Sequence, residues 1–258
     1  AWGLGYFGMP HILLRFMAIE DEKKLKLSRR VATIWVVISL FVAVFIGVIG
    51  YTMSKVGALE MLTGSNSETI IVKISALLSQ HGVIFALLAG VILAGILAST
   101  MSTSDSQLLA ASSAVSSDIL GAFRKDSSNK NGSMAAARIT LLVISVVAAF
   151  IARNPDSSVF AIVSFAWAGF GAAFGPVVLF SLFWKRTSKW GALAGMVCGG
   201  SMVFIWKYLI RPLGGIWNIY ELLPAFLIAC AAIVIVSLLT PKPSKEIEEE
   251  FDRVAQMK

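Results

Sequence analysis

The sequence predicts an all-α protein that crosses a membrane several times as a polytopic helix bundle. Of its 258 residues, 57% are hydrophobic and only 14% are charged, and the mean hydropathy is +0.80. A soluble domain has roughly 45–50% apolar and about 25% charged residues, so this composition excludes an ordinary soluble domain. The net charge of +7 lies in short Lys and Arg clusters between apolar segments. Such clusters are typical of loops beside a lipid bilayer, and we expect no nucleic-acid partner.

Seven apolar segments come close to the roughly 20 residues that a helix needs to cross the hydrocarbon core. They cover residues 1–18, 31–53, 82–104, 135–152, 158–184, 190–210 and 222–240. Of the 22 Lys and Arg residues, 17 fall in the stretches 15–30, 123–138 and 184–189 and in the tail 241–258. The positive-inside rule therefore predicts a multi-pass protein of the cell membrane, a single transmembrane domain whose C-terminal tail is cytoplasmic.

The connections also carry signals. Apolar residues spaced along 68–80 predict an amphipathic helix on the outer surface, which either packs on the bundle or acts as a gate. The stretch 82–123 contains almost no helix breaker, so a helix of about 60 Å would extend into the cytoplasm, with Asp118 and Arg124 at its wet end. A tight turn is expected at 153–156, and Pro176 predicts a kink in the fifth segment.

Polar residues gather where the third segment lies deep in the bilayer. Hydroxyl groups, an amide and a carboxylate are costly inside a membrane, so their clustering indicates function. Ser99, Ser102, Thr103 and Ser106 follow i, i+3, i+4, i+7 spacing and share one helix face. Neutral oxygens in a row suit a weakly held hard cation, and we hypothesise a sodium site in a transporter. Asp105 either ligates an ion beside Ser102 and Ser106 or holds neighbouring helices together.

The first segment is the second candidate region. Trp2, Tyr6 and Pro10 lie at i, i+4, i+8, whereas Gly3, Gly5 and Gly8 make a regular helix there doubtful. Transporters bind substrates where helices are interrupted, but aromatic residues also form belts at membrane interfaces, so the spacing leaves both roles open. His11 has no second metal-binding residue at ligand spacing, and Cys198 and Cys230 both lie in apolar runs. We find no catalytic motif and expect no enzyme.

Three blocks of this sequence resemble the sodium/solute symporter family. They are W-G-L-G-Y-F-G-M-P-H-I-L-L-R-F-M-A-I at 2–19, A-S-T-M-S-T-S-D-S-Q-L-L-A-A-S-S at 98–113, and G-P-V-V-L-F-S-L-F-W-K-R-T-S-K-W-G-A-L-A-G at 175–195. The resemblance covers essentially the whole chain. It implies a five-plus-five inverted-repeat bundle and sodium-coupled symport of a small solute. The first block is the more specific one, and it implies L-proline.

The resemblance also implies roles for individual residues. Ser102 and Thr103 match sodium-ligating hydroxyls, and Ser99 matches a position that ligates through its backbone carbonyl. Trp2, Tyr6 and Pro10 match residues implicated in substrate binding or gating, which favours the substrate role over the belt role. Ser102, Asp105 and Ser106 match the place where some relatives hold a second sodium ion.

The chain begins at Ala1 in an apolar pattern without an initiator Met, and the family's first core helix is not in it. We therefore expect the bundle to be N-terminally incomplete, with its partner helices on a missing part of the same protein. The alternatives are a sibling symporter for pantothenate, a sugar or a carboxylate, and a transporter-like sensory membrane module.

Overall fold

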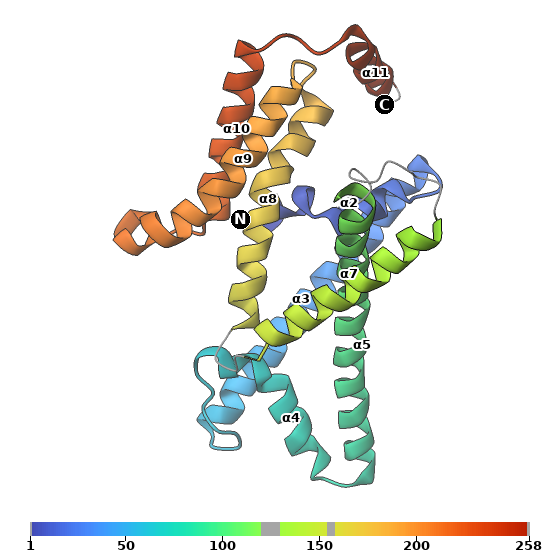
Figure 1. The fold of residues 1–258 in the computed structure, drawn as a ribbon. Helices are drawn as coiled ribbons and strands as arrows, with labels where there is room; N and C mark the ends of the chain where they lie inside the picture. Colours follow the sequence, from blue (N-terminus) through green and yellow to red (C-terminus); the bar gives the residue numbers. More distant parts are fainter. Residues whose placement is uncertain (1, 120–129, 154–157, 257–258) are drawn as a thin grey trace. The chain divides into compact units, whose positions relative to one another are not determined.

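The computed structural model describes residues 2–119, 130–153 and 158–256. Within these ranges the regular structure is helical, and six helices are long and apolar enough to cross a membrane, which confirms the predicted all-α membrane class. Arg124 and most of the predicted turn at 153–156 lie outside the described residues. The chain divides into two compact units, residues 1–18 with 160–258 and residues 19–159, and each is described by itself (Figure 1).

The second unit, residues 19–159, begins with the short 3₁₀ turn η2 (Glu22–Lys24) and the long helix α3 (Leu25–Lys55). A 3₁₀ turn, η3 (Gly64–Thr69), leads into α4 (Ile70–Ser79), where an amphipathic helix was predicted. The helix α5 (Val83–Ser113) follows and ends in a π-helical turn, η4 (Ala114–Ile119), so the long predicted helix changes geometry before its expected end. The last helix of this unit is α7 (Lys130–Ile151).

Small residues and polar side chains hold this unit together. Gly50 of α3 lies directly against Ile70 of α4, where any larger residue would clash. Buried Ser112 of α5 donates a 2.7 Å hydrogen bond to the carbonyl of Ala137 in α7. The helix α4 packs against α3 and α5, as the packing interpretation of this segment predicts. At its start, Glu68 accepts hydrogen bonds from the Ser158 hydroxyl and the Val159 amide.

The first unit combines the start of the chain with its last helices. The start consists of α1 (Trp2–Gly5), a 3₁₀ turn η1 (Tyr6–Gly8) and α2 (Pro10–Met17). The later part runs through α8 (Val159–Phe183), α9 (Lys189–Ile205), a π-helical turn η5 (Trp206–Ile210), the 3₁₀ turns η6 (Arg211–Leu213) and η7 (Gly215–Trp217), α10 (Leu222–Leu239) and α11 (Lys245–Gln256). The first predicted span, 1–18, is therefore not one helix.

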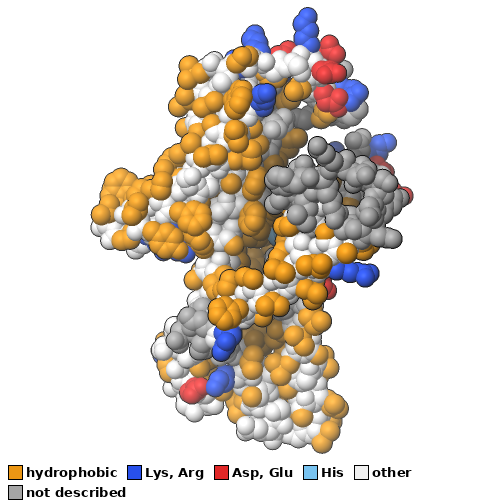
Figure 2. All heavy atoms as spheres, in the orientation of Figure 1, with side chains coloured by type: hydrophobic (Ala, Val, Ile, Leu, Met, Phe, Trp, Pro, Cys, Tyr) orange, Lys and Arg blue, Asp and Glu red, His pale blue; other side chains and the backbone are white. Residues whose placement is uncertain are grey.

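The core of this unit lies where α8, α9 and α10 meet. Ala168 and Ala172 of α8, Val203 of α9, and Leu222, Ala225 and Phe226 of α10 form one buried cluster. Figure 2 shows apolar side chains over the outward surface of the long helices, with acidic side chains gathered at α11. A small core beneath an apolar surface is what a bundle solvated by lipid tails needs, because helix packing there depends on close contact between small residues.

Pro176 lies inside α8, which continues through it. Because proline has no N–H, the carbonyl of Ala172 loses its helical donor. Gly199 of α9 lies directly against that carbonyl, at a place where a Cβ atom would clash. The freed carbonyl is thus covered by a neighbouring backbone, in a position that only glycine can occupy.

Hydrogen bonds join α9 and α10 at both ends. At the first end, buried Ser188 caps α9 by accepting from Gly191 N at 3.0 Å, and its hydroxyl lies 2.7 Å from that of Thr240. At the other end, Arg211 of η6, which follows α9 and η5, pairs with buried Glu221 at the start of α10 at 3.1 Å. Beside this pair, Tyr220 donates a 2.6 Å hydrogen bond to Ser164 O in α8. Burial, with Glu221 adding to it, raises the pKa of Tyr220 to about 12, so the phenol keeps its proton.

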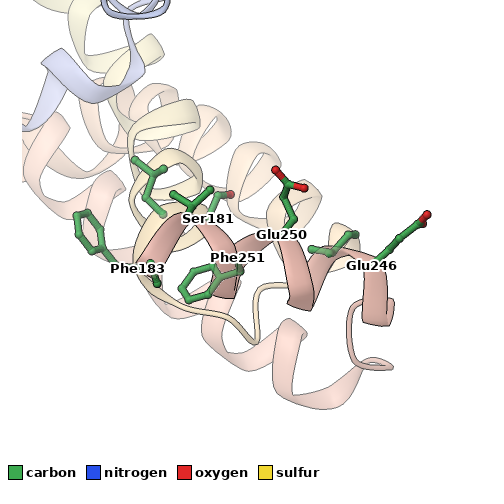
Figure 3. A pocket seen from close by; sticks show the side chains of 9 residues that line it. Ser181, Phe183, Glu246, Glu250 and Phe251 are labelled. Carbon is green, nitrogen blue, oxygen red and sulfur yellow. The ribbon is translucent and has the colours of Figure 1, made fainter. Parts of the chain in front are cut away.

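The helix α11 carries an acidic face and an apolar stripe of Ile247, Phe251 and Val254. A groove of about 730 Å³ separates this stripe from Leu182 and Phe183 at the end of α8. Figure 3 shows Phe251 beside the end of α8 while Glu246 points outward. An ion pair between Lys185 and Asp252, 2.5 Å apart, ties α11 to the loop after α8.

We expect Gly199→Ala to destabilise the protein by about 1–3 kcal/mol, because the new methyl group would overlap the Ala172 carbonyl. The adjacent Gly200→Ala is a matched control, since the nearest atom to its Cβ position is 3.9 Å away. Thermal unfolding of the two variants in detergent measures the difference. Equal unfolding temperatures would show that the two backbones are not in contact.

We expect Lys185→Met to weaken the attachment of α11. The rate of proteolysis of the tail should rise by no more than about fivefold, because an exposed ion pair contributes little to the free energy of folding. The hydrogen bond from Lys185 to Asp252 raises the pKa of the lysine, so this contribution is present at neutral pH and is lost as pH rises through that pKa. Lys189→Met, which removes a cation over Trp190, is the control. Identical proteolysis of both variants from neutral to alkaline pH would contradict the contact.

Candidate functional site

The predicted cation ligands lie on one face of α5, as their spacing indicated. The hydroxyls of Ser102 and Thr103 both donate to the same acceptor, the carbonyl oxygen of Ser99, over 2.9 Å and 3.2 Å. Three oxygens of the predicted set thus converge within one turn of helix. The convergence follows from the sequence, because residues three and four positions after an acceptor return to its face of the helix.

This hydrogen bonding leaves the lone pairs of the two hydroxyl oxygens available to coordinate a cation. Each hydroxyl has one proton and two lone pairs, and the proton of Ser102 or Thr103 is used within the helix. The lone pairs can therefore point away from the helix toward a cation. The arrangement is neutral, so it can bind a hard cation without the strength of a carboxylate cage.

The second predicted ion position has fewer contacts between its residues. Ser106 donates to the carbonyl of Ser102 at 3.0 Å and is partly buried. Asp105 is exposed, and it makes no hydrogen bond or ion pair with the part of the chain that the structure describes. Within the described residues of the second unit, Asp105 therefore has no partner through which it could hold a neighbouring helix. Its role as an ion ligand stays a prediction.

The opening segment is interrupted where its glycines and proline predicted. The α-helical turn α1 gives way to η1, and Met9 is extended with φ −86° and ψ 114°. Pro10 then starts α2 at a position where its missing N–H costs nothing. The helix is interrupted at Met9, whose N–H still donates to Tyr6 O and whose carbonyl accepts from the N–H groups of Ile12 and Leu13. Interrupted helices are the places at which transporters bind substrates.

Aromatic rings from α8 hold this segment. The ring of Trp2 stacks on Trp167 at 5.4 Å between centroids and on Phe160 at 5.6 Å. Phe160 and Trp167 are seven residues apart on one helix, about 10.5 Å along its axis, so the Trp2 ring lies between them. Tyr6 meets the edge of Trp167 at 5.0 Å and remains 49% exposed.

Glycine contacts bring the two backbones together. Gly5 lies directly against the Trp167 indole, and Gly8 lies against the carbonyl of Phe170. In α8, a Cβ atom at Gly171 would lie 2.6 Å from the Cα of Gly5. The glycines of the opening segment therefore have a packing reason in addition to the break in the helix.

The structure groups the predicted residues into two sets. Trp2, Tyr6 and Pro10 belong to the first unit, and Ser99, Ser102, Thr103, Asp105 and Ser106 belong to the second. Residues within each set are brought together as described above. Trp167 was missed from the sequence, although Trp167, Gly171 and Gly175 lie at i, i+4, i+8 on one face of α8 and could have indicated a packing track.

The described residues form no metal site of the kind built from His, Cys and carboxylate side chains. No group of three or more His, Cys, Asp or Glu side chains is placed among them to hold a metal ion. The predicted cation site is of a different kind, built from hydroxyl and carbonyl oxygens.

A sequence model of the sodium:solute symporter family matches residues 1–199. The sodium/proline symporter of Haemophilus influenzae is 41% identical over 98% of this chain and 49% of its own length. The sodium/proline symporter of Escherichia coli is 39% identical over 97% of this chain and 48% of its own. The osmoregulated proline transporter of Bacillus subtilis is 39% identical over 95% and 48%. The chain thus spans about half the length of the curated relatives it matches, and no solved structure matches it.

Proposed function

This chain belongs to the sodium:solute symporter family, and we propose that it forms part of a carrier that couples sodium entry to the uptake of L-proline. Its relatives are transporters and not enzymes. The proposed carrier lies in the cell membrane as a multi-pass protein, with its C-terminal tail in the cytoplasm.

The observation that carries the proposal is the convergence of Ser102, Thr103 and the Ser99 carbonyl on one turn of α5. In the proposed site the hydroxyl oxygens of Ser102 and Thr103 coordinate sodium through their remaining lone pairs. The Ser99 carbonyl, which accepts both hydroxyl protons in this structure, joins them when one of these hydrogen bonds opens. Three neutral oxygens do not complete the shell of a hard cation. The remaining ligands come from segments that the relatives have in the half of their length that this chain does not match.

The proposed substrate segment is the interrupted stretch from Trp2 to Pro10. Tyr6 offers the solute an exposed ring next to the break in the helix at Met9. The choice of L-proline is supported by the names of the relatives, several of which are sodium/proline symporters. Trp2 contributes from between two rings of α8, so it shapes the segment and does not present a free face.

Coupling follows from linkage. Sodium bound at Ser102 and Thr103 stabilises the conformation that receives the solute, and each ligand then raises the affinity for the other by the same factor. The sodium gradient supplies the driving force for uptake. Neutral ligands suit this cycle, because a carrier must release its coupling ion inside the cell.

We expect Thr103→Val, in the full-length transporter, to raise the sodium concentration for half-maximal uptake by about tenfold or more, a loss of about 1.4 kcal/mol or more. Valine keeps the branched shape but removes the ligating oxygen. Sodium-activation curves of labelled proline uptake in proteoliposomes measure the effect.

Thr100→Val is the matched control for this measurement. Thr100 also donates its hydroxyl within α5, to Ile96 O at 2.9 Å, but it takes no part in the contacts with Ser99 O. Its sodium activation should be unchanged. Normal sodium activation in Thr103→Val would remove α5 from the proposed ion site.

We expect an excess of unlabelled L-proline to suppress labelled proline uptake, while pantothenate, a sugar and a carboxylate leave it intact. Suppression by one of the other solutes would favour the sibling-symporter alternative. Sodium-dependent binding of proline without accumulation inside vesicles would favour a transporter-like sensory module, because a sensor needs to bind its ligand but not to move it.

A further inference from the structure

We propose that Trp167 of α8 is a positioning residue for the substrate segment, holding Tyr6 in place through its indole ring. The inference rests on the proposed function, since it assigns Tyr6 to substrate contact. Trp167 itself does not need to touch the solute.

Three contacts join Trp167 to the opening segment. Its Nε1 donates a 3.0 Å hydrogen bond to the backbone carbonyl of Trp2. Its ring stacks on that of Trp2 with an interplanar angle of 28° and meets Tyr6 edge-on at 83°. One side chain therefore contacts both the backbone and the two aromatic residues of the proposed substrate site.

The hydrogen bond has a structural reason. The helix α1 has only four residues, so its internal hydrogen bonding is minimal. The indole N–H donates to the Trp2 carbonyl from another helix, and this hydrogen bond ties the short helix to α8.

The surroundings leave Trp167 little room to move. Gly5 lies so close to the indole that a methyl group at this position would overlap it. The Trp2 ring, held between Phe160 and Trp167, covers one face of the indole. Tyr6 approaches the same indole but keeps half of its own surface exposed. The place of Tyr6 thus depends on a ring that is packed on several sides.

A residue that acts by positioning Tyr6 should affect solute affinity more than turnover. We expect Trp167→Phe in the full-length transporter to raise the half-saturating proline concentration by about three- to tenfold, as for the loss of one aromatic contact. The maximal rate per transporter and the half-saturating sodium concentration should stay the same. Phenylalanine keeps a ring but cannot donate to Trp2 O.

Trp184→Phe is the matched control, because Trp184 packs edge-on against Phe180 at 5.5 Å and takes no part in the contacts of the opening segment. Its proline affinity should match that of the unmodified transporter. A double variant distinguishes positioning from general damage: in a Tyr6→Ala background, Trp167→Phe should have little further effect. The same fold-change in both backgrounds, or a fall in maximal rate with unchanged affinity, would overturn the proposal.

A second readout does not need proline transport. In a protein with Cys198 and Cys230 replaced by Ala, maleimide labelling of Tyr6→Cys reports the exposure of that position. We expect Trp167→Phe to change the labelling rate at least about threefold, again the effect of one lost contact, and Trp184→Phe to leave it unchanged. An unchanged rate in Trp167→Phe would refute positioning. Absence of proline uptake by the unmodified protein, with a changed rate, would instead refute the proposed function alone.

Discussion

Close backbone contact along α8 is the constraint on which the first unit depends. A helix within a bilayer cannot rely on water for its polar groups, so each interruption needs a partner nearby. The carbonyl that Pro176 frees lies against the backbone of Gly199 in α9, and the Trp167 indole donates to the Trp2 carbonyl at the start of α1. Glycines on three segments allow these approaches. The break that suits substrate binding can exist because α8 supports the chain beside it.

The second unit differs from the first in how its candidate site is formed. Its candidate site arises from one helix, where a repeat of three and four residues places hydroxyls over a shared carbonyl. The hydroxyl protons are used internally, and the oxygens keep their neutral acceptor character. A carboxylate, Asp105, lies next to this row and remains exposed. A candidate site built from neutral oxygens is consistent with an ion that has to leave as readily as it enters.

Local periodicity explains what could be predicted from the sequence. Apolar runs indicated the long helices α3, α5, α8, α9 and α10, and the spacing of Ser99, Ser102 and Thr103 placed them on one face. Gly3, Gly5, Gly8 and Pro10 indicated an irregular start, because glycine and proline are unfavourable in the interior of a helix. The role of Trp167 could not be predicted in this way. Its contacts join residues 165 positions apart, and no local pattern encodes which ring will lie against which carbonyl. For the same reason, the packing of Trp2 between two rings was not anticipated.

The paired fastenings of α9 and α10 restrict how the first unit can move. Ser188 and Thr240 join the two helices at one end, and Arg211 and Glu221 join them at the other. Contacts near both ends oppose sliding of α10 along α9, so the two helices are expected to move more as one hairpin than past each other.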